Sequence, residues 1–492
     1  MKTKNLIVTA VALLMPLMVG AQALKGSYFI DNSLNRNKMN PAFAPRSNYF
    51  QMPFIGNFSA GMTSNLDIPT FIYEDNGAPV TFLSGQISPK KFDRRLPERP
   101  HFDAEISENI INFGFFTPQH SFWTFDLGIK AGIDGDLPAG FFTSLKDGAG
   151  TSGKTYEIGN VNAYATASIQ AALGYSRDII DGLRVGAKIR AIAPVTYMAL
   201  NLENIRLTTG KDKWTMESEG HLRTAMQGLE VTPVEGEMIP GVEMDIDRML
   251  GNSALAGFGY SVDLGAEYVL NLPGEFFDGL SFSAAVTDLG MVHYKKDAVC
   301  SFGIKGNMEW AGIQNAEGHS GYLSEAIDEF LGNAEGNTRY DEEKASGFTR
   351  STMPNLYLGV EMPFLKNMMS IGLLYSGRFS HSFYRNELTA AFNFTPAEWF
   401  ALGVNYSFLN TARTLGGIIE FTPKKGVNFF LGFDYLPLAF KSLDSELVPE
   451  FFKGMGFSDM VVPNAWRMNC HFGLSFALGS KYGRKTDLIG SR

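Results

Sequence analysis

Charged side chains recur at every second position in several long apolar segments of this chain of 492 residues. Side chains alternate between the two faces of a strand, so charges with this spacing share one face. Such a face could line a polar path or hold a segment folded against it. It could equally be the balanced, hydrogen-bonded interior that any buried set of charges requires. The candidates are Asp126, Lys130, Arg184, Lys188, Arg190, Asp263, Glu267, Arg385, Glu387, Asp434, Arg467 and His471.

These residues form no catalytic pattern. The 7 histidines include His381 and His471, which fall at strand positions where an inward polar side chain suffices. The sequence has no Gly-x-Ser-x-Gly elbow and no Cys/His cluster with the spacing of metal ligands. The two cysteines, Cys300 and Cys470, lie too far apart to suggest a disulfide framework. We therefore expect no enzyme activity, no cofactor and no metal.

The last alternating segment shows best what would position these charges. Its apolar residues are Trp466, Met468, Cys470, Phe472, Leu474, Phe476 and Leu478, and Arg467 and His471 lie between them. A strand with one apolar face and about ten residues is what a tilted strand of an outer-membrane barrel needs. We expect this segment to close a barrel by pairing with a first strand near Phe54.

The same alternation recurs along the chain and predicts an antiparallel barrel of about 14 strands. The expected strands include 49–62, 110–116, 121–131, 161–175, 183–192, 257–270, 280–287, five between 354 and 422, and 427–435, with Tyr435 on the outer face. A soluble β-sandwich also alternates. Two observations favour the transmembrane barrel: strands of about 10 to 15 residues, against five or six in soluble proteins, and an apolar face rich in Phe, Tyr, Trp and Leu.

Composition agrees with this all-β class. The chain has 52 glycines and 40 phenylalanines, while charged residues make up 19%. A barrel needs apolar residues toward lipid, small and polar residues toward the lumen, and aromatic residues at both interfaces. The formal charge of -9 argues against nucleic acid as a partner, because that binding needs a cationic surface.

The first 23 residues have the pattern of a secretory signal peptide. Lys2 and Lys4 precede an apolar run from Leu6 to Val19, and small-residue cleavage sites follow at 19–21 and 21–23. No later run reaches about 18 apolar residues, the length of a membrane helix. We therefore expect the mature chain in the outer membrane of a Gram-negative cell, after cleavage of the signal peptide.

Between the signal and the first strand, residues 24–48 are expected to be an N-terminal hatch or plug, since Pro41 and Pro45 exclude a regular helix or a central strand. The barrel would span residues 49–480. Large loops are expected at 64–107, 307–347 and 437–462, with short helical insertions such as 322–331. Residues 481–492 would form a polar periplasmic tail.

Three motifs carry a resemblance to a known superfamily. Asn40-Pro41-Ala42 resembles the NPA motif that opens FadL-type outer-membrane channels. The segments 260–268 and 279–290, which contain Asp263 and Asp288, resemble the paired "DLG" strands of PorV-like members. The chain also resembles an uncharacterised family of Gram-negative outer-membrane proteins, a domain of unknown function within the same group. The resemblance implies a barrel with its N-terminal segment folded inward as a plug.

Two functions follow from this resemblance as expectations. A FadL-like channel would carry hydrophobic small molecules, with Asn40, Pro41 and Ala42 as the hinge of the hatch. A PorV-like barrel would instead be a scaffold or shuttle in type IX secretion or surface attachment, with secretion or cell-envelope proteins as partners. In both readings outer-membrane lipid surrounds the barrel. The cargo and the oligomeric state stay open.

Overall fold

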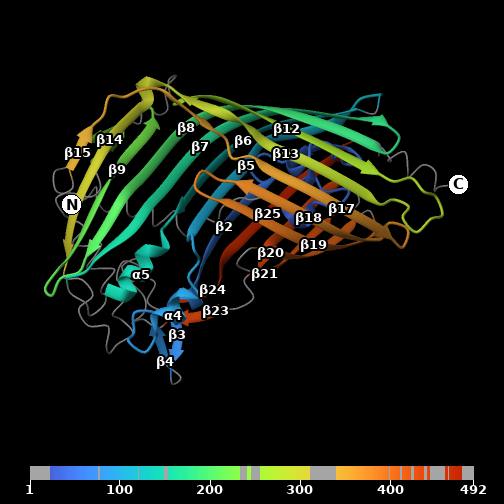
Figure 1. The fold of residues 1–492 in the computed structure, drawn as a ribbon. Helices are drawn as coiled ribbons and strands as arrows, with labels where there is room; N and C mark the ends of the chain where they lie inside the picture. The colour runs from blue at the N-terminus through green and yellow to red at the C-terminus, as the bar shows by residue number, and fades with distance from the viewer. Residues whose placement is uncertain are drawn as a thin grey trace.

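The chain folds into a closed antiparallel barrel of 14 strands, as the sequence predicts (Figure 1). The computed structural model describes residues 23–75, 78–119, 121–148, 153–232, 241–244, 255–310, 339–397, 399–409, 413–422, 426–436, 440–443, 460–463 and 465–478. The predicted signal peptide up to residue 22, the helix at 322–331 and the tail at 481–492 lie outside the described residues. Within the described ranges, no helix is both long and apolar enough to cross a membrane.

Four of the barrel strands are built from more than one segment, and two others, β7 and β8, are unusually long. The first is β1 (Asn48–Gln51) with β2 (Phe58–Asp67), and it is followed by β5 (His101–Phe116), β6 (Phe122–Asp136), β7 (Thr155–Ile180) and β8 (Leu183–Thr208). The sixth joins β9 (Trp214–Met226) with β12 (Gly257–Val269), and the seventh joins β13 (Ser281–Tyr294) with β14 (Val299–Trp310) across η2 (Lys296–Ala298).

The remaining strands form the other half of the wall. The eighth is composed of β15 (Arg339–Glu342), β16 (Phe348–Ser351) and β17 (Asn355–Phe364). It is followed by β18 (Met369–Phe379), β19 (Tyr384–Ala397), β20 (Phe400–Leu409), β21 (Arg413–Phe421), β22 (Val427–Leu436) and β25 (Ala465–Leu478).

The barrel closes between its last and first strands, as expected. Phe472 of β25 pairs with Phe58 of β2, and Phe476 pairs with Phe50 of β1. Between β1 and β2 the chain leaves the ladder, and Phe54 is exposed with a φ of 64°. Pro53 lacks a backbone donor, which explains why the first strand is interrupted at this point.

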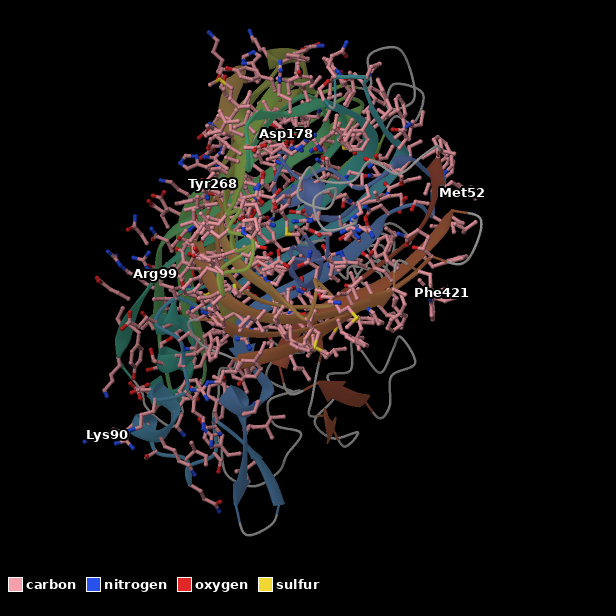
Figure 2. All side chains as sticks on the ribbon, turned by 90° about the vertical axis from the view of Figure 1, so that its right-hand side faces the viewer. Met52, Lys90, Arg99, Asp178, Tyr268 and Phe421 are labelled. Atoms are coloured by element: carbon pink, nitrogen blue, oxygen red, sulfur yellow. The ribbon has the colours of Figure 1, made fainter. Side chains whose placement is uncertain are left out.

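The outer surface of the barrel is an apolar belt. Large apolar side chains stay exposed along every part of the wall, among them Ile129, Ile189, Phe258, Leu264, Leu289, Ile371, Phe392, Phe421 and Phe472. Figure 2 shows Tyr268 and Phe421 on the outside of the ribbon, with many nitrogen and oxygen atoms inside the ring of strands. A soluble surface would not expose so continuous an apolar area, whereas a lipid-facing surface must. The strands therefore form a transmembrane barrel of the outer-membrane type.

Short turns gather at one end of the barrel and long excursions at the other. The short turns include 181–182, where Gly182 has a φ of 79°, and 365–368. At the opposite end β7 and β8, with 26 residues each, extend well beyond the roughly 9–11 residues that cross a bilayer. Short turns are periplasmic in such barrels and long loops are extracellular.

A folded cap packs on this projecting part of the sheet. It contains α3 (Ile68–Phe71), β3 (Ile72–Asp75), β4 (Ala78–Thr81), α4 (Pro89–Asp93) and α5 (Ala139–Gly148). Phe82, Ile87 and Phe92 of the cap share one core with Leu207 of β8 and Trp214 of β9. The remaining small pairs are β10 (Leu229–Thr232) with β11 (Gly241–Met244), and β23 (Phe440–Leu443) with β24 (Met460–Pro463).

The predicted loop bounds are wrong at their edges. Strand β2 continues to Asp67 and β5 begins at His101, so only residues 68–100 leave the barrel within the predicted loop 64–107. Phe102, Ala104 and Ile106 still alternate with Asp103, Glu105 and Ser107, and those polar residues point inward rather than marking a loop. Strand β14 likewise runs to Trp310, inside the predicted loop 307–347, and the predicted loop 437–462 contains β23 and part of β24.

One predicted side-chain orientation is also wrong. Tyr435 was expected on the outer face of its strand, but it is buried together with its neighbour Asp434. The ladder between β21 and β22 shifts register at this point, so that two consecutive side chains face inward. The amide oxygen of Asn469 accepts hydrogen bonds from the backbone nitrogens of both Asp434 and Tyr435, at 2.6 and 3.2 Å. A regular alternation cannot predict such a bulge.

Candidate functional site: the filled lumen

The N-terminal segment lies inside the barrel. Its regular elements are η1 (Lys25–Ser27) and α2 (Arg36–Met39), and the rest is a series of turns. Its side chains are largely buried, and they meet strands from opposite parts of the wall. Residues 24–48 are called the hatch below. Several of the predicted inward charges are the groups that hold it.

The Asn40-Pro41-Ala42 motif rests on a pair of glycines in the wall. Gly186 of β8 and Gly265 of β12 are direct partners in the ladder. A Cβ at Gly186 would lie 2.2 Å from the carbonyl oxygen of Pro41, and one at Gly265 would lie 2.0 Å from Oδ1 of Asn40. The Asn40 amide donates to the carbonyl of Ala266 at 3.1 Å, and its Oδ1 accepts from the nitrogen of Ala42 at 2.9 Å. Only glycine leaves room for this contact.

Lys25 anchors the other end of the hatch. Its ammonium donates to the carboxylate of Glu387 and, at 2.6 Å, to the hydroxyl of Tyr435. The carboxylate of Asp434 accepts from the backbone nitrogens of Lys25 and Gly26, both at 2.8 Å. Both charged side chains of the ion pair are nearly inaccessible to solvent. Two of the predicted inward carboxylates, Glu387 and Asp434, therefore hold the hatch directly.

Between these anchors the hatch packs by aromatic contacts. The ring of Tyr28 lies edge-on to those of Phe29 and Phe43, with centroids 5.0 Å apart in both pairs. Phe29 covers Gly372 of β18, where an added Cβ would lie 2.4 Å from the ring. The guanidinium of Arg36 lies 3.9 Å above the ring of Phe43 and pairs with Glu267 at 3.6 Å. The aromatic side chains of the hatch thus form a small core inside the lumen.

All the sequence-predicted inward residues lie on the lumen side, but they belong to separate groups. Glu267, Glu387 and Asp434 contact the hatch, while Arg184 pairs with Asp178 at 3.0 Å near the short-turn rim. The others pair with one another or with residues that the sequence analysis did not single out. These pairs are Lys188 with Asp126 at 3.0 Å, Arg190 with Asp263 at 3.0 Å, Lys130 with Glu105 at 3.2 Å, Arg385 with Asp103 at 2.6 Å, Arg467 with Asp67 at 3.1 Å, and His471 with Ser59 at 2.6 Å.

The paired aspartates of the DLG-like strands meet at a bulge. The β12–β13 ladder shifts register beside Asp263, and Asp288 has a φ of 57°. The backbone nitrogen of Asp288 donates to Oδ1 of Asp263 at 2.7 Å, and Arg190 pairs with both carboxylates. The distorted backbone is thereby fixed by an ion pair with β8. This arrangement gives the two aspartates a structural role in the wall.

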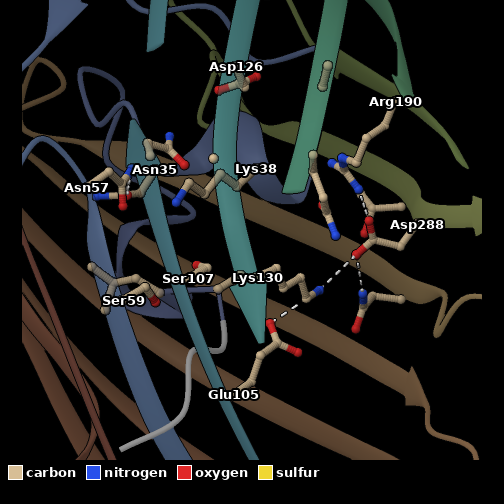
Figure 3. Close-up of a pocket in the computed structure, with 18 of the residues that line it drawn as sticks. Asn35, Lys38, Asn57, Ser59, Glu105, Ser107, Asp126, Lys130, Arg190 and Asp288 are labelled. Carbon is tan, nitrogen blue, oxygen red and sulfur yellow. Dashed lines mark hydrogen bonds and ion pairs between the residues drawn. The ribbon is translucent and has the colours of Figure 1, made fainter. Parts of the chain in front are cut away.

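Among the described residues, the lumen contains two cavities of about 100 Å³ or more, and a smaller one of about 20 Å³ beside Lys25, Arg378 and Arg385. The inner chamber, of about 150 Å³, is lined by the hatch residues Asn35 and Lys38 and by charged wall residues (Figure 3). The outer chamber, of about 100 Å³, lies closer to the long-loop end. Apolar atoms make up most of its exposed surface, although six charged residues also line it: Glu105, Lys130, Asp134, Asp288, Arg350 and Arg378. Its apolar lining includes Ile133, Ile192, Tyr197, Val292 and Tyr294. A mostly apolar chamber deep in a polar barrel is a place where a small apolar molecule can be bound.

His381 lies in the turn between β18 and β19, next to Asp134 of β6. The ring nitrogen Nδ1 is 3.5 Å from the carboxylate, and the hydroxyls of Ser380 and Ser382 donate to the same carboxylate at 2.8 and 3.4 Å. Because both serines donate to Asp134, neither is paired with His381 as a nucleophile would be with its base. Among the described residues no group of three or more His, Cys, Asp or Glu side chains could hold a metal ion.

Several residues of the lumen were missed by the sequence analysis. Asp103 and Glu105 fell within the predicted loop, although their spacing of two and the apolar neighbours Phe102 and Ala104 mark a strand. Lys25 was hidden in the N-terminal segment, which has no periodicity. Arg378 pairs with Glu105 at 2.5 Å, a contact between distant strands that no local pattern encodes.

Comparison with solved structures finds β-barrels of low similarity. The Pseudomonas putida toluene transporter TodX is 12% identical, with a TM-score of 0.40 over 94% of this chain and 100% of that chain. The Ralstonia pickettii toluene transporter TbuX is 10% identical, with a TM-score of 0.38 over 91% of this chain and 95% of that chain. The monoaromatic hydrocarbon channel CymD is 12% identical, with a TM-score of 0.39 over 94% of this chain and 99% of that chain.

No curated protein matches the chain. The family model that matches it covers residues 41–434, from Pro41 of the hatch motif to Asp434 of the Lys25 anchor. The matched segment thus includes the wall residues that hold the hatch, Gly186, Gly265, Glu387 and Asp434, but of the hatch itself only residues 41–48. The chain belongs to DUF5723, a family of unknown function.

Proposed function

We propose that this protein is a gated outer-membrane channel for hydrophobic small molecules, and that the structure represents its closed state. The mature chain would lack residues 1–23, with its short turns and its polar tail, 481–492, in the periplasm. The hatch would be the first gate, turning about Asn40, Pro41 and Ala42. Its two anchors lie at separate places on the wall, so one can release while the other holds.

The outer chamber is the observation that carries this proposal. Its walls combine the aliphatic side chains of Ile133, Ile192 and Val292 with the rings of Tyr197 and Tyr294. An apolar cavity of about 150 Å³ can accept benzene, so a chamber of about 100 Å³ approaches the scale of one aromatic ring. A barrel that served only as a rigid scaffold would gain stability by filling this space.

Blocking the outer chamber tests the proposal. Val292→Phe should fill it, and uptake of naphthalene by Gram-negative cells that express the barrel should fall at least fivefold. Leu289→Phe is the matched control, because Leu289 lies on the same strand but is 55% exposed on the lipid face. The mobility of the barrel on a gel before and after heating shows whether each variant has folded. Equal uptake by the two folded variants and the native barrel would reject the channel.

The extracellular cap supports a second candidate, a scaffold that binds cell-envelope or secretion proteins. The cap packs its apolar side chains into a core that it shares with the projecting ends of β7, β8 and β9. Burial lowers the pKa of Lys146 in α5, whose ammonium donates to the carbonyl of Ser84 at 2.7 Å. A simple pore needs no such folded domain. In-cell crosslinking followed by mass spectrometry should recover a stoichiometric protein partner if the scaffold is correct, and none if the barrel acts alone.

A further inference from the structure

The two chambers are separated by a layer of ion pairs. Glu105, Lys130, Asp288 and Arg378 line both cavities. Figure 3 shows the ammonium of Lys130 between the carboxylates of Glu105 and Asp288, to which it pairs at 3.2 and 3.6 Å. A molecule that passed from one chamber to the other would have to separate these charges.

The central contacts of this layer join opposite walls of the barrel. Strand β5 is the second of the fourteen and β18 is the ninth, so they lie half a circumference apart. Arg378 of β18 nevertheless donates to Glu105 of β5 at 2.5 Å, and Arg385 of β19 donates to Asp103 of β5 at 2.6 Å. These side chains therefore bridge the lumen at this level.

Asp103, Glu105, Arg378 and Arg385 form two neighbouring ion pairs across the lumen, and we call these four residues the clasp. Asp103 and Glu105 are two residues apart on β5 and face the same way, while Arg378 and Arg385 are direct partners in the β18–β19 ladder. Each arginine meets one carboxylate, and Thr63 of β2 hydrogen-bonds to both Asp103 and Arg385. All four charged side chains are largely buried. Because removal of one partner would leave a buried charge uncompensated, the clasp favours all-or-none opening.

The tip of the same hairpin closes the mouth above the clasp. Ser380 donates to Asp134 of β6 at 2.8 Å, and the ring of Phe383 stacks on His101 of β5 with centroids 4.1 Å apart. The hairpin β18–β19 therefore contacts the opposite wall at three successive positions. The hydrogen bonds of Arg378, Ser380 and Arg385 run to β2, β5 and β6. The same hairpin also holds Lys25 of the hatch, through Glu387 of β19, but that ion pair involves none of these three residues.

We propose that the clasp of Asp103, Glu105, Arg378 and Arg385 is a second gate, in series with the hatch, that controls passage between the inner and outer chambers. This inference rests on the proposed channel function and deepens it. The Asn40-Pro41-Ala42 end of the hatch lies toward the short turns, and its Lys25 end lies beside the clasp, since Glu387 follows Arg385 by two residues on β19. Opening either one alone leaves the barrel closed.

Planar bilayer recording on four purified barrels tests the series arrangement. They are the native protein, a variant lacking residues 24–46, the clasp variant E105A/R378A, and the combination of both changes. The combined variant should conduct potassium chloride at least tenfold better than either single variant. If deletion of the hatch alone gives the conductance of the combined variant, there is no second gate and the proposal is wrong.

Control variants show whether a rise in conductance comes specifically from opening the clasp. An exposed ion pair in the projecting sheet, Lys213 with Glu309, provides the variant K213A/E309A, which should add no conductance to the hatch deletion. If the barrel that lacks residues 24–46 does not fold, the variant G186V/G265V replaces it, because the added side chains displace the Asn40-Pro41-Ala42 motif from the wall. A folded combined variant that does not conduct overturns the clasp as the remaining closure. Conductance of the combined variant, with naphthalene uptake unaffected by Val292→Phe, rejects the hydrophobic cargo while keeping the gate.

Discussion

Gly186 and Gly265 are direct partners across the β8–β12 ladder, and the backbone of Pro41 and the side chain of Asn40 occupy the space that their side chains would need. The contact joins the N-terminal motif to two strands that begin about 140 and about 215 residues further along the chain. It explains at once why the wall is glycine at both positions and why the motif begins with an asparagine, whose amide satisfies the nearby Ala266 carbonyl. The shape of the wall at Gly186 and Gly265 is therefore complementary to the Asn40-Pro41-Ala42 motif of the hatch.

Substitution of either glycine should unseat the hatch. Gly186→Val places branched carbon atoms where the carbonyl of Pro41 lies, so the motif must move. We expect residues 24–46 to become cleavable by protease in the folded, detergent-solubilised barrel. Ala187→Val is the matched control, because Ala187 is the next residue on β8 and is exposed on the outer face. Equal resistance of residues 24–46 to protease in both variants would show that the contact with Gly186 does not hold the hatch.

Loss of the Lys25 ammonium should destabilise the barrel strongly. Lys25→Met leaves the Glu387 carboxylate buried without its cation, which typically costs about 3–5 kcal/mol. The free energy of unfolding in urea would measure this. Lys213→Met removes a lysine whose ion pair with Glu309 is exposed, and should cost less than about 1 kcal/mol. If both variants lose a similar amount of unfolding free energy, the buried ion pair of Lys25 with Glu387 does not anchor the hatch.

The cap should unfold independently of the barrel. Phe92 is fully buried in the cap core, and its truncation to alanine should cost about 3–5 kcal/mol there. We expect trypsin to cut Phe92→Ala between Lys90 and Arg95 while the gel mobility of the unheated barrel stays native. Phe276→Ala serves as the control, since Phe276 is 81% exposed in the β12–β13 connection. Loss of barrel mobility in Phe92→Ala would show that the two parts fold as one unit.

Both cysteines should react as free thiols. Cys300 and Cys470 form no disulfide, and each is partly accessible. In denaturant without reductant, the chain should therefore gain the mass of two maleimide groups. A gain that appears only after reduction would indicate a disulfide and contradict the described arrangement of β14 and β25.

Local periodicity was sufficient to predict the wall of the barrel but not the contacts across it. The alternation from Trp466 to Leu478 assigned Arg467 and His471 to the lumen side, where both are buried. It misplaced Tyr435, because a bulge adds a residue without leaving a mark in the pattern. It also hid Asp103 and Glu105, whose charges resembled those of a loop. Their partners Arg378 and Arg385 lie about 280 residues away, and such pairing depends on the closed shape of the barrel.

The hatch must leave its place for cargo to pass, and a disulfide between Phe29→Cys and Gly372→Cys would prevent that movement. An added Cβ at Gly372 lies 2.8 Å from Cγ of Phe29, so the two Cβ atoms come within the range of a disulfide. In a background with Cys300→Ser and Cys470→Ser, oxidation should reduce naphthalene uptake to that of cells without the barrel, and reductant should restore it. Undiminished uptake by the fully crosslinked protein would show that cargo passes without movement of the hatch.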